Sequence, residues 1–197
     1  AFFHPHFDTQ ESILQTIQTL LDEAITELSK PATDNKIRPG GDDLIFSGDT
    51  DAWIKTAWML KARYAMRLSK RDEAKAYTDA LTFITNGYNA GLSGSADDCD
   101  APFNGSGNDQ NQWWAFEINR GGYLRMNEYF VKLLKQKNDP RLSLFVSETN
   151  NQDPDSIYLG APMGSTDPAS FSYIGSCYGS VNSSLPLVTF AEVKFIE

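Results

Sequence analysis

The sequence predicts a mainly α-helical fold with tetratricopeptide-like helical hairpins, long irregular loops and few short strands. Three observations lead to this expectation. Apolar residues between positions 9 and 85 recur at helical spacing, and a very short connection joins the second and third helices. Two later stretches are rich in glycine, serine, asparagine and aspartate, which is typical of loops.

The first helix is expected over residues Thr9 to Leu28. Asp8 or Thr9 can cap its start, and Pro31 ends it. Its apolar residues form one stripe, which consists of Ile13, Leu14, Ile17, Leu20, Leu21, Ala24, Ile25 and Leu28.

The second helix is expected to begin after Asp49, with Thr50 or Asp51 as its cap. Trp53 and Trp58 belong to its apolar face. We therefore expect both indoles to pack in the core and not to bind a ligand.

The third helix is expected over about residues 71–85, with Gly87 as its C-terminal stop. Only Ser69 and Lys70 separate it from the second helix, so the two must pack as an antiparallel hairpin. A hairpin of this length is geometrically similar to a tetratricopeptide unit, although the sequence shows no clean repeat consensus.

The composition changes after the hairpin. Residues 91–122 combine small polar residues with interleaved aromatics, so we expect a long irregular region of the kind that carries function or disorder. A fourth helix is expected over about 127–137, with a break at Asp139-Pro140-Arg141. The last helix is expected to start near Pro186, since proline suits a first helical turn.

These elements divide the chain into five segments. They are a helical-hairpin core (1–90), a loop-rich ligand-binding region (91–125), a helix (126–145), a second loop-rich region (146–185) and the start of a further core helix (186–197). Both ends of the sequence fall inside apparent elements, so we expect a fragment of a longer protein that is truncated at both ends.

The charge balance restricts the possible partners. With 17 basic and 26 acidic residues, the formal net charge is −9, which argues against nucleic acid because phosphate binding needs clustered Lys and Arg. Neutral ligands such as sugars are compatible with it. No run of apolar residues is long enough to predict a transmembrane helix. The two cysteines, Cys99 and Cys177, fit either free thiols or an exported disulfide.

An ordered set of short motifs resembles the SusD/RagB family across nearly the whole chain. The motifs are His4-Pro5-His6-Phe7-Asp8-Thr9, Leu20-Leu21-Asp22-Glu23-Ala24, Asp43-Leu44-Ile45-Phe46-Ser47-Gly48-Asp49, Trp53-Ile54-Lys55-Thr56-Ala57, Leu60-Lys61-Ala62-Arg63, Asp139-Pro140-Arg141, Tyr158-Leu159-Gly160 and Phe190-Ala191-Glu192-Val193-Lys194-Phe195. Trp58 stands where the family usually has asparagine. No single motif is specific; the order of the set carries the resemblance.

The resemblance implies a location and a partner that composition does not show. SusD-like proteins are lipid-anchored at the outer face of a Gram-negative outer membrane, through an N-terminal cysteine that this sequence does not contain. They capture nutrients, many of them oligosaccharides and some of them peptides, and pass them to a SusC-type TonB-dependent transporter. No catalytic residue or cofactor is a feature of the family, so we expect neither here.

The tryptophan pair Trp113-Trp114 is the leading candidate for the ligand site. Sugar binding needs exposed aromatic planes beside amide or charged groups, and the polar stretch 108–112 precedes the two indoles. In an extended segment neighbouring side chains point to opposite faces, so one indole is expected to be exposed. The alternative is that an indole only packs this loop onto the helices. Weaker candidates are Tyr123, Phe103, Asn119 and Arg120.

Metal binding and catalysis find little support in the sequence. His4 and His6 lack further ligands at suitable spacing, and the acidic stretch 97–109 does not follow the calcium-binding EF-hand order. Glu117 and Glu128 could be posed as a glycosidase pair, but such pairs are easy to find among 26 acidic residues. A helical glycoside hydrolase and a non-catalytic protein-binding scaffold therefore remain as alternatives.

Overall fold

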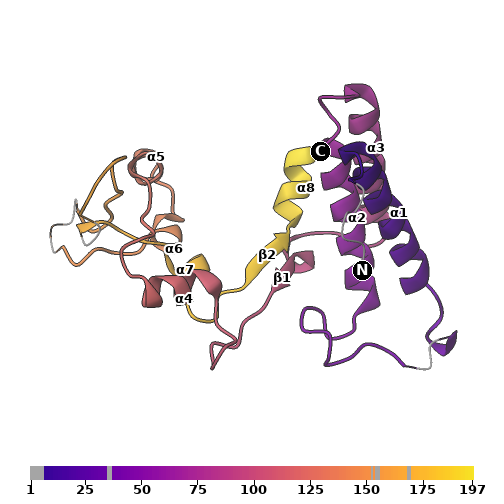
Figure 1. The fold of residues 1–197 in the computed structure, drawn as a ribbon, viewed down its shortest axis with the longest axis horizontal. Helices are drawn as coiled ribbons and strands as arrows, with labels where there is room; N and C mark the ends of the chain where they lie inside the picture. Colours follow the sequence, from indigo (N-terminus) through magenta and orange to yellow (C-terminus); the bar gives the residue numbers. More distant parts are fainter. Residues whose placement is uncertain (1–6, 35–36, 152, 154–155, 168–169) are drawn as a thin grey trace. The chain divides into compact units, whose positions relative to one another are not determined.

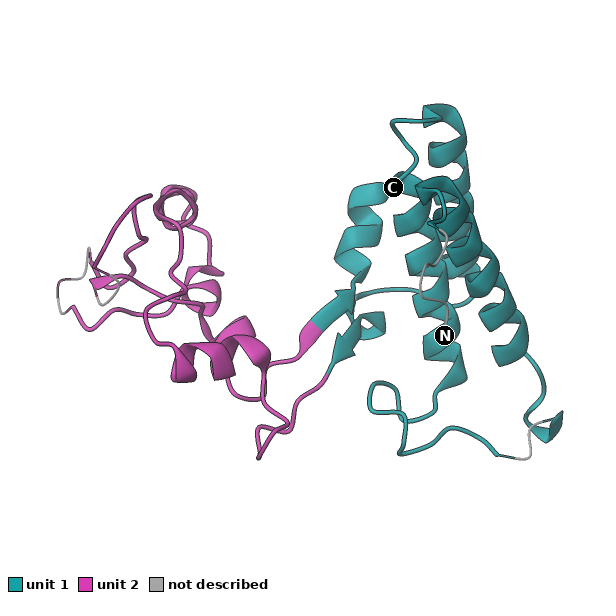
Figure 2. Ribbon diagram, viewed as in Figure 1, with its two compact units in different colours: residues 1–101, 186–197 teal, residues 102–185 magenta. Residues whose placement is uncertain are grey.

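The computed structural model describes residues 7–34, 37–151, 153, 156–167 and 170–197, which form two compact units (Figures 1 and 2). Unit 1 comprises residues 1–101 and 186–197, and unit 2 comprises residues 102–185. The fold is mainly α, with eight α-helices and one two-stranded sheet among the described residues. None of the described helices is both long and apolar enough to cross a membrane. His4 and His6 lie outside the described residues.

Three helices form most of unit 1: α1 (Gln10–Leu28), α2 (Thr50–Met66) and α3 (Glu73–Asn89). The middle helix, α2, packs against both of the others. Helices α2 and α3 are antiparallel neighbours, as the short connection predicted (Figure 1). Short 3-10 turns lie at Ala32–Asp34 (η1) and Ser95–Asp97 (η2).

Small residues on α2 allow this close packing. Ala57, Ala62 and Ala65 are buried, and Met59 between them belongs to the core of unit 1. That core continues into the two strands and α8 through Cys99, Val188 and Val193. The short strands β1 (Cys99–Ala101) and β2 (Leu185–Val188) pair with each other and thus join the two sequence segments that make up unit 1.

The expected helix start near Pro186 is wrong. Pro186 lies in β2, and α8 (Phe190–Ile196) starts only after Thr189, whose hydroxyl accepts a hydrogen bond from the backbone N–H of Glu192 at 3.2 Å. A proline without an N–H is tolerated in a two-stranded sheet because each strand has one unpaired edge. Pairing with β1, which is remote in sequence, thus overrides the local preference of proline for a first helical turn.

Two predicted helix ends are also wrong. The cap of α2 is Asp49, whose Oδ1 accepts from the backbone N–H groups of Asp51 and Ala52, and neither Thr50 nor Asp51 takes that role. Helix α3 continues through Gly87, where an added Cβ would lie 3.3 Å from Leu92 and 3.4 Å from Trp58. Gly87 therefore allows Leu92 and Trp58 to pack closely against α3 and does not end the helix.

The end of α3 follows from Gly91 instead. The chain turns there with φ +92°, and the N–H of Leu92 bonds back to the carbonyl of Gly87 at 3.0 Å. A residue with positive φ just past a helix is a common C-terminal stop, and glycine adopts it without strain.

The described residues of unit 2 form four short α-helices: α4 (Gln112–Asn119), α5 (Glu128–Gln136), α6 (Leu142–Phe145) and α7 (Ser176–Gly179). Its core is small and consists of Val131, Leu134 and Val146 with partly buried hydrophobics around them. Tyr129 is 74% exposed, because Val131 and Leu134 occupy the buried face of α5. Most of the other described residues of unit 2 lie in loops.

Candidate functional site

The two candidate tryptophans lie on helix α4 and not in an extended loop. Asn111 caps this helix: its Oδ1 accepts from the N–H of Trp113 at 2.8 Å and of Trp114 at 3.1 Å. The Asn111 side chain is fully buried, and its Nδ2 donates to the carbonyl of Ser183 at 2.7 Å. One side chain thus both starts the helix and ties it to a loop about seventy residues further along the chain.

One indole is exposed, as predicted, but for a different reason. Trp113 is 44% exposed and Trp114 is half-buried. Neighbours on a helix are rotated by about 100° and do not alternate between opposite faces. The helix therefore leaves Trp114 the more buried of the two indoles and Trp113 partly exposed to solvent.

A hollow of about 340 Å³ opens beside the two indoles. All of its lining residues belong to unit 2: Trp113, Trp114, Glu117, Ile118, Leu124, Tyr173, Ile174 and Gly179. Helical spacing explains the contribution of α4, because positions three and four apart share a face. We call this space the indole hollow.

Glu117 makes one edge of the indole hollow polar. Its Oε1 accepts from Nη1 of Arg125 at 2.8 Å, and the guanidinium lies 5.9 Å from the ring centre of Tyr173. Both charged side chains are largely buried. Among the described residues, the second oxygen, Oε2, has no hydrogen-bonding partner, and it is buried. The lining of the hollow therefore combines aromatic planes with a carboxylate held by Arg125, a combination suited to polar ligands with apolar faces.

The weaker candidate residues lie outside the indole hollow. Tyr123 is 73% exposed and meets Phe116 edge to face at 6.3 Å. The amide of Asn119 donates to the carbonyl of Ala115 at 2.8 Å, which occupies it within α4. Arg120 is exposed at the end of α4, and Phe103 is half-buried in the loop that precedes it.

Sequence reasoning did not assign most of the other lining residues of the indole hollow, among them Tyr173 and Ile174, or the supporting residues Asn111 and Arg125. A signal existed for Asn111, because asparagine directly before Gln112-Trp113-Trp114-Ala115 fits a helix cap. No local signal marks Tyr173 or Ile174. They reach the site because the loop of Gly175 contacts α6 so closely that a Cβ on Gly175 would lie 2.4 Å from the carbonyl oxygen of Leu144.

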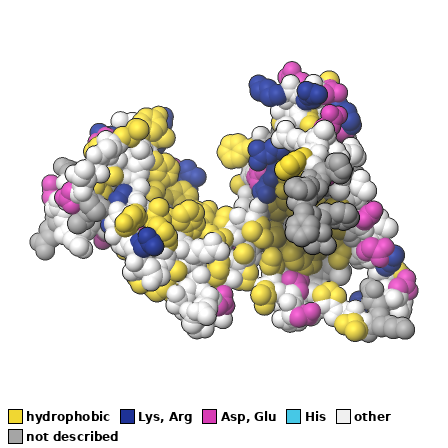
Figure 3. All heavy atoms as spheres, in the orientation of Figure 1, with side chains coloured by type: hydrophobic (Ala, Val, Ile, Leu, Met, Phe, Trp, Pro, Cys, Tyr) yellow, Lys and Arg dark blue, Asp and Glu magenta, His cyan; other side chains and the backbone are white. Residues whose placement is uncertain are grey.

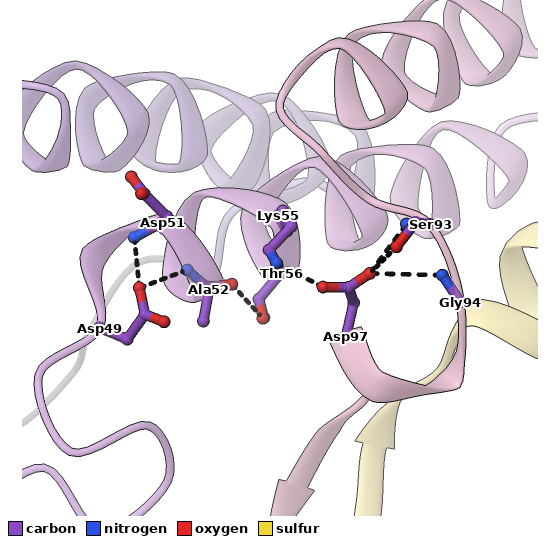
Figure 4. A network of polar contacts seen from close by, with 8 residues as sticks. All are labelled: Asp49, Asp51, Ala52, Lys55, Thr56, Ser93, Gly94 and Asp97. Atoms are coloured by element: carbon purple, nitrogen blue, oxygen red, sulfur yellow. Dashed lines mark hydrogen bonds and ion pairs between the residues drawn. The ribbon is translucent and has the colours of Figure 1, made fainter.

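The first part of the acidic stretch, residues 97–101, belongs to unit 1 and has structural roles there. Asp97 forms an ion pair with Lys55 of α2 and accepts from the N–H groups of Ser93 and Gly94 (Figure 4). Burial raises the pKa of Asp97, but these partners outweigh burial and the net pKa is lowered. Asp98 accepts from the N–H of Phe190 at 2.6 Å. Within the described residues, no group of three or more metal-binding side chains is present.

The posed glycosidase pair is divided between two separate ion pairs. Glu117 is held by Arg125, whereas Glu128 pairs with Lys132 one turn along α5 at 2.7 Å. Glycosidases need two carboxylates that act together as acid and base or nucleophile, whereas each of these carboxylates is paired with a cationic side chain.

Comparison with known proteins decides the family. The profile of a SusD-like family described as "Starch-binding associating with outer membrane" matches residues 1–197. The chain belongs to the SusD-like family. Among curated protein sequences, none matches this SusD-like chain.

Solved SusD-like structures share the fold. A SusD-like protein from Bacteroides thetaiotaomicron is 23% identical with a TM-score of 0.78, over 99% of this chain and 40% of that protein. A SusD/RagB family protein from the same organism is 26% identical with a TM-score of 0.76, over 98% and 41%. A chitin-binding SusD homologue from Flavobacterium johnsoniae is 24% identical with a TM-score of 0.77, over 96% and 39%. The chain thus spans about two fifths of the length of these relatives.

Proposed function

We propose that this chain is the ligand-binding part of a surface protein that captures oligosaccharides in the indole hollow. The exposed face of Trp113, held by the Asn111 cap beside the Glu117–Arg125 ion pair, carries the proposal. A pyranose ring has an apolar C–H face, which stacks on an indole, and a rim of hydroxyls, which need hydrogen-bonding partners.

The rigidity of the hollow supports binding without large ordering costs. Asn111 fixes the helix that carries both indoles, and Arg125 fixes the carboxylate of Glu117. A preformed site loses little conformational entropy when a ligand arrives. The net charge of −9 favours neutral saccharides over sulfated or uronic ones, because like charges repel.

Family membership supports the rest of the proposed role. The family description joins starch binding with the outer membrane, and the Flavobacterium johnsoniae relative is described as chitin-binding. We propose that the full-length protein is lipid-anchored at the outer membrane surface and delivers its ligand to a SusC-type TonB-dependent transporter. We also propose that it has no catalytic activity, cofactor or nucleic-acid partner.

A glycan-array screen of the full-length protein tests this function. Wild type should bind neutral oligosaccharides, and Trp113→Ala should lose at least tenfold in affinity while Trp114→Ala loses less. Tyr129→Ala is the matched control, since it removes an aromatic side chain that is more exposed than Trp113 and lies outside the hollow, and it should leave binding unchanged.

Three other results would contradict the proposal in different ways. Binding that survives both tryptophan changes would place the saccharide site elsewhere in the protein. No binding to any glycan would favour peptide cargo or a protein-binding scaffold. Turnover of a bound oligosaccharide that Glu117→Gln abolishes would indicate a glycoside hydrolase.

A further inference from the structure

Trp113 also lines a second, more apolar hollow in unit 2. This space measures about 370 Å³ and is lined by Trp113, Met126, Phe130, Phe145, Ile174 and Tyr178. Trp113 and Ile174 border both spaces, so the two hollows adjoin. Exposed hydrophobic side chains gather over unit 2 on the face drawn in Figure 3. We call the second space the apolar hollow.

The apolar hollow differs from the indole hollow in its chemistry. Among the described residues, its lining includes no charged side chain, and its side-chain hydrogen-bonding groups are the indole N–H of Trp113 and the hydroxyl of Tyr178. A hydroxylated sugar ring placed there would find few hydrogen-bonding partners on the protein, whereas an apolar group would gain free energy by removing this apolar surface from water. The occupant should therefore be apolar.

The aromatic side chains that make up most of the lining favour an aromatic occupant. Phe145 and Tyr178 are nearly parallel, with an interplanar angle of 3° and ring centres 6.2 Å apart. Aromatic rings prefer offset-stacked or edge-to-face neighbours, and a cavity of roughly 150 Å³ is enough to hold benzene. A flexible acyl chain would lose more conformational entropy on binding than a rigid ring.

We propose that the apolar hollow binds an aromatic substituent carried by the saccharide in the indole hollow, so that the protein prefers aryl-substituted glycans. This inference rests on the saccharide-binding function proposed above. Trp113 stands between the two parts of such a ligand and contacts both, and the continuity of the two hollows through this indole and Ile174 supports a single ligand that spans them.

The test compares matched glycosides on the full-length protein. Calorimetry would measure the affinity of the methyl, phenyl and hexyl β-glycosides of N,N′-diacetylchitobiose, chosen because a related structure is chitin-binding. We expect the phenyl glycoside to bind at least tenfold more tightly than the methyl one, and more tightly than the hexyl one. Equal affinities for phenyl and methyl would overturn the inference, and a preference for hexyl would replace the aromatic occupant with an acyl chain.

Variants of Tyr178 locate the effect. Tyr178→Ala should remove most of the phenyl advantage without changing the affinity for the methyl glycoside, whereas Tyr178→Phe, which keeps the ring, should retain the advantage. Tyr129→Ala, outside both hollows, should also retain it. An undiminished advantage in a folded Tyr178→Ala protein would place the phenyl group elsewhere.

A measurement on wild type guards against a variant that fails to fold. With methyl-labelled methionine, ring currents should shift the Met126 methyl NMR signal when the phenyl glycoside binds but not when the methyl glycoside binds. The Met126→Leu variant identifies this signal.

Benzyl alcohol separates the aromatic site from the saccharide site. At millimolar concentration it should also shift the Met126 methyl signal. If benzyl alcohol shifts Met126 while no saccharide binds, the saccharide function fails but the aromatic site stands. An unmoved Met126 signal would overturn the inference.

Discussion

The indole Nε1 of Trp53 donates to Oδ2 of Asp43 at 2.7 Å, and this bond closes the turn that leads into helix α2. Asp43 also accepts from the backbone N–H groups of Ile45, Phe46 and Gly48. The Trp53 ring meets Phe46 edge to face at 5.0 Å and packs against the core of unit 1. One carboxylate therefore organises the turn that precedes α2.

Asp43 should make the stability of the protein depend on pH in acid. The Trp53 hydrogen bond, above all, lowers the pKa of Asp43 to about 2, against an unfolded value of about 3.9. Its contribution to the free energy of unfolding is therefore present above about pH 4 and is lost as the pH falls to about 2. Urea unfolding should show Asp43→Asn less stable than wild type at pH 7, with the difference shrinking below pH 4.

Trp53→Phe provides the control for this pH dependence. It keeps a ring against the core but removes the indole N–H, so its destabilisation relative to wild type should also shrink in acid. A stability difference between Asp43→Asn and wild type that stays constant from pH 7 to pH 2 would show that the charge of Asp43 is irrelevant to folding.

Asn111 should control both local stability and ligand affinity. Asn111→Ala removes the cap of α4 and the tether to Ser183, so we expect a loss of about 1–3 kcal/mol in the free energy of unfolding. Saccharide affinity should fall with it, because both indoles lose their fixed position. Chemical unfolding and calorimetric titration measure the two effects.

Asn111→Ser separates the cap from the tether. Serine caps a helix about as well as asparagine does, but it has no amide to donate to the carbonyl of Ser183 and, unlike aspartate, it buries no charge. We expect it to keep α4 and lose the tether, with an intermediate effect on affinity. If Asn111→Ala left both stability and affinity at wild-type levels, Asn111 would have no positioning role.

Arg63 should be essential for docking α8 onto α2. Its Nε donates to Oε1 of Glu192 at 2.6 Å, its Nη2 pairs with the other carboxylate oxygen, and Nη2 also donates to the carbonyl of Leu187 at 2.8 Å. The Glu192 hydrogen bond is the main reason that the pKa of Arg63 is raised. Arg63→Ala should cost about 2 kcal/mol in the free energy of unfolding, measured by urea denaturation.

The conservative change Arg63→Lys tests the geometry of this contact. Lysine keeps the charge but cannot make two parallel bonds to a carboxylate, so it should recover only part of the loss. If Arg63→Lys had the same free energy of unfolding as wild type, charge attraction alone would account for the contribution of this contact.

The two cysteines should differ sharply in reactivity. Cys99 is buried in the core of unit 1, and burial raises the pKa of its thiol, whereas Cys177 is exposed; both are free. Because the thiolate is the reactive form, iodoacetamide at pH 8 should modify Cys177 in the native protein and Cys99 only after unfolding. Peptide mass spectrometry would read both sites.

Cys177→Ser should abolish the native modification within this part of the protein. Rapid labelling of Cys99 in that native variant would contradict the buried position of the thiol. A disulfide found between the two cysteines would contradict the free state in which the structure places them.

Much of unit 1 could be predicted because its information is local. The apolar period that predicts the helices, Thr9 as one of the two candidate caps of α1, and the short connection before α3 each act within a few residues, and all three are confirmed. Trp53 packs against the core of unit 1, as its place on a helix face predicted, and both Trp53 and Trp58 are partly buried. Pro186 escaped prediction because its partner strand lies more than eighty residues earlier in the chain.

The candidate site depends more on contacts between residues remote in sequence than on local information. Sequence alone identified Trp113 and Trp114 as the aromatic pair, since two adjacent indoles in a polar stretch are conspicuous. Only the tertiary structure decided which indole is exposed, because that depends on the Asn111 cap and its tether to Ser183. Tyr173 and Ile174 line the hollow for the same reason. The hydrogen bonds and close backbone contacts that place them link residues remote in sequence, and a local sequence pattern cannot predict such contacts.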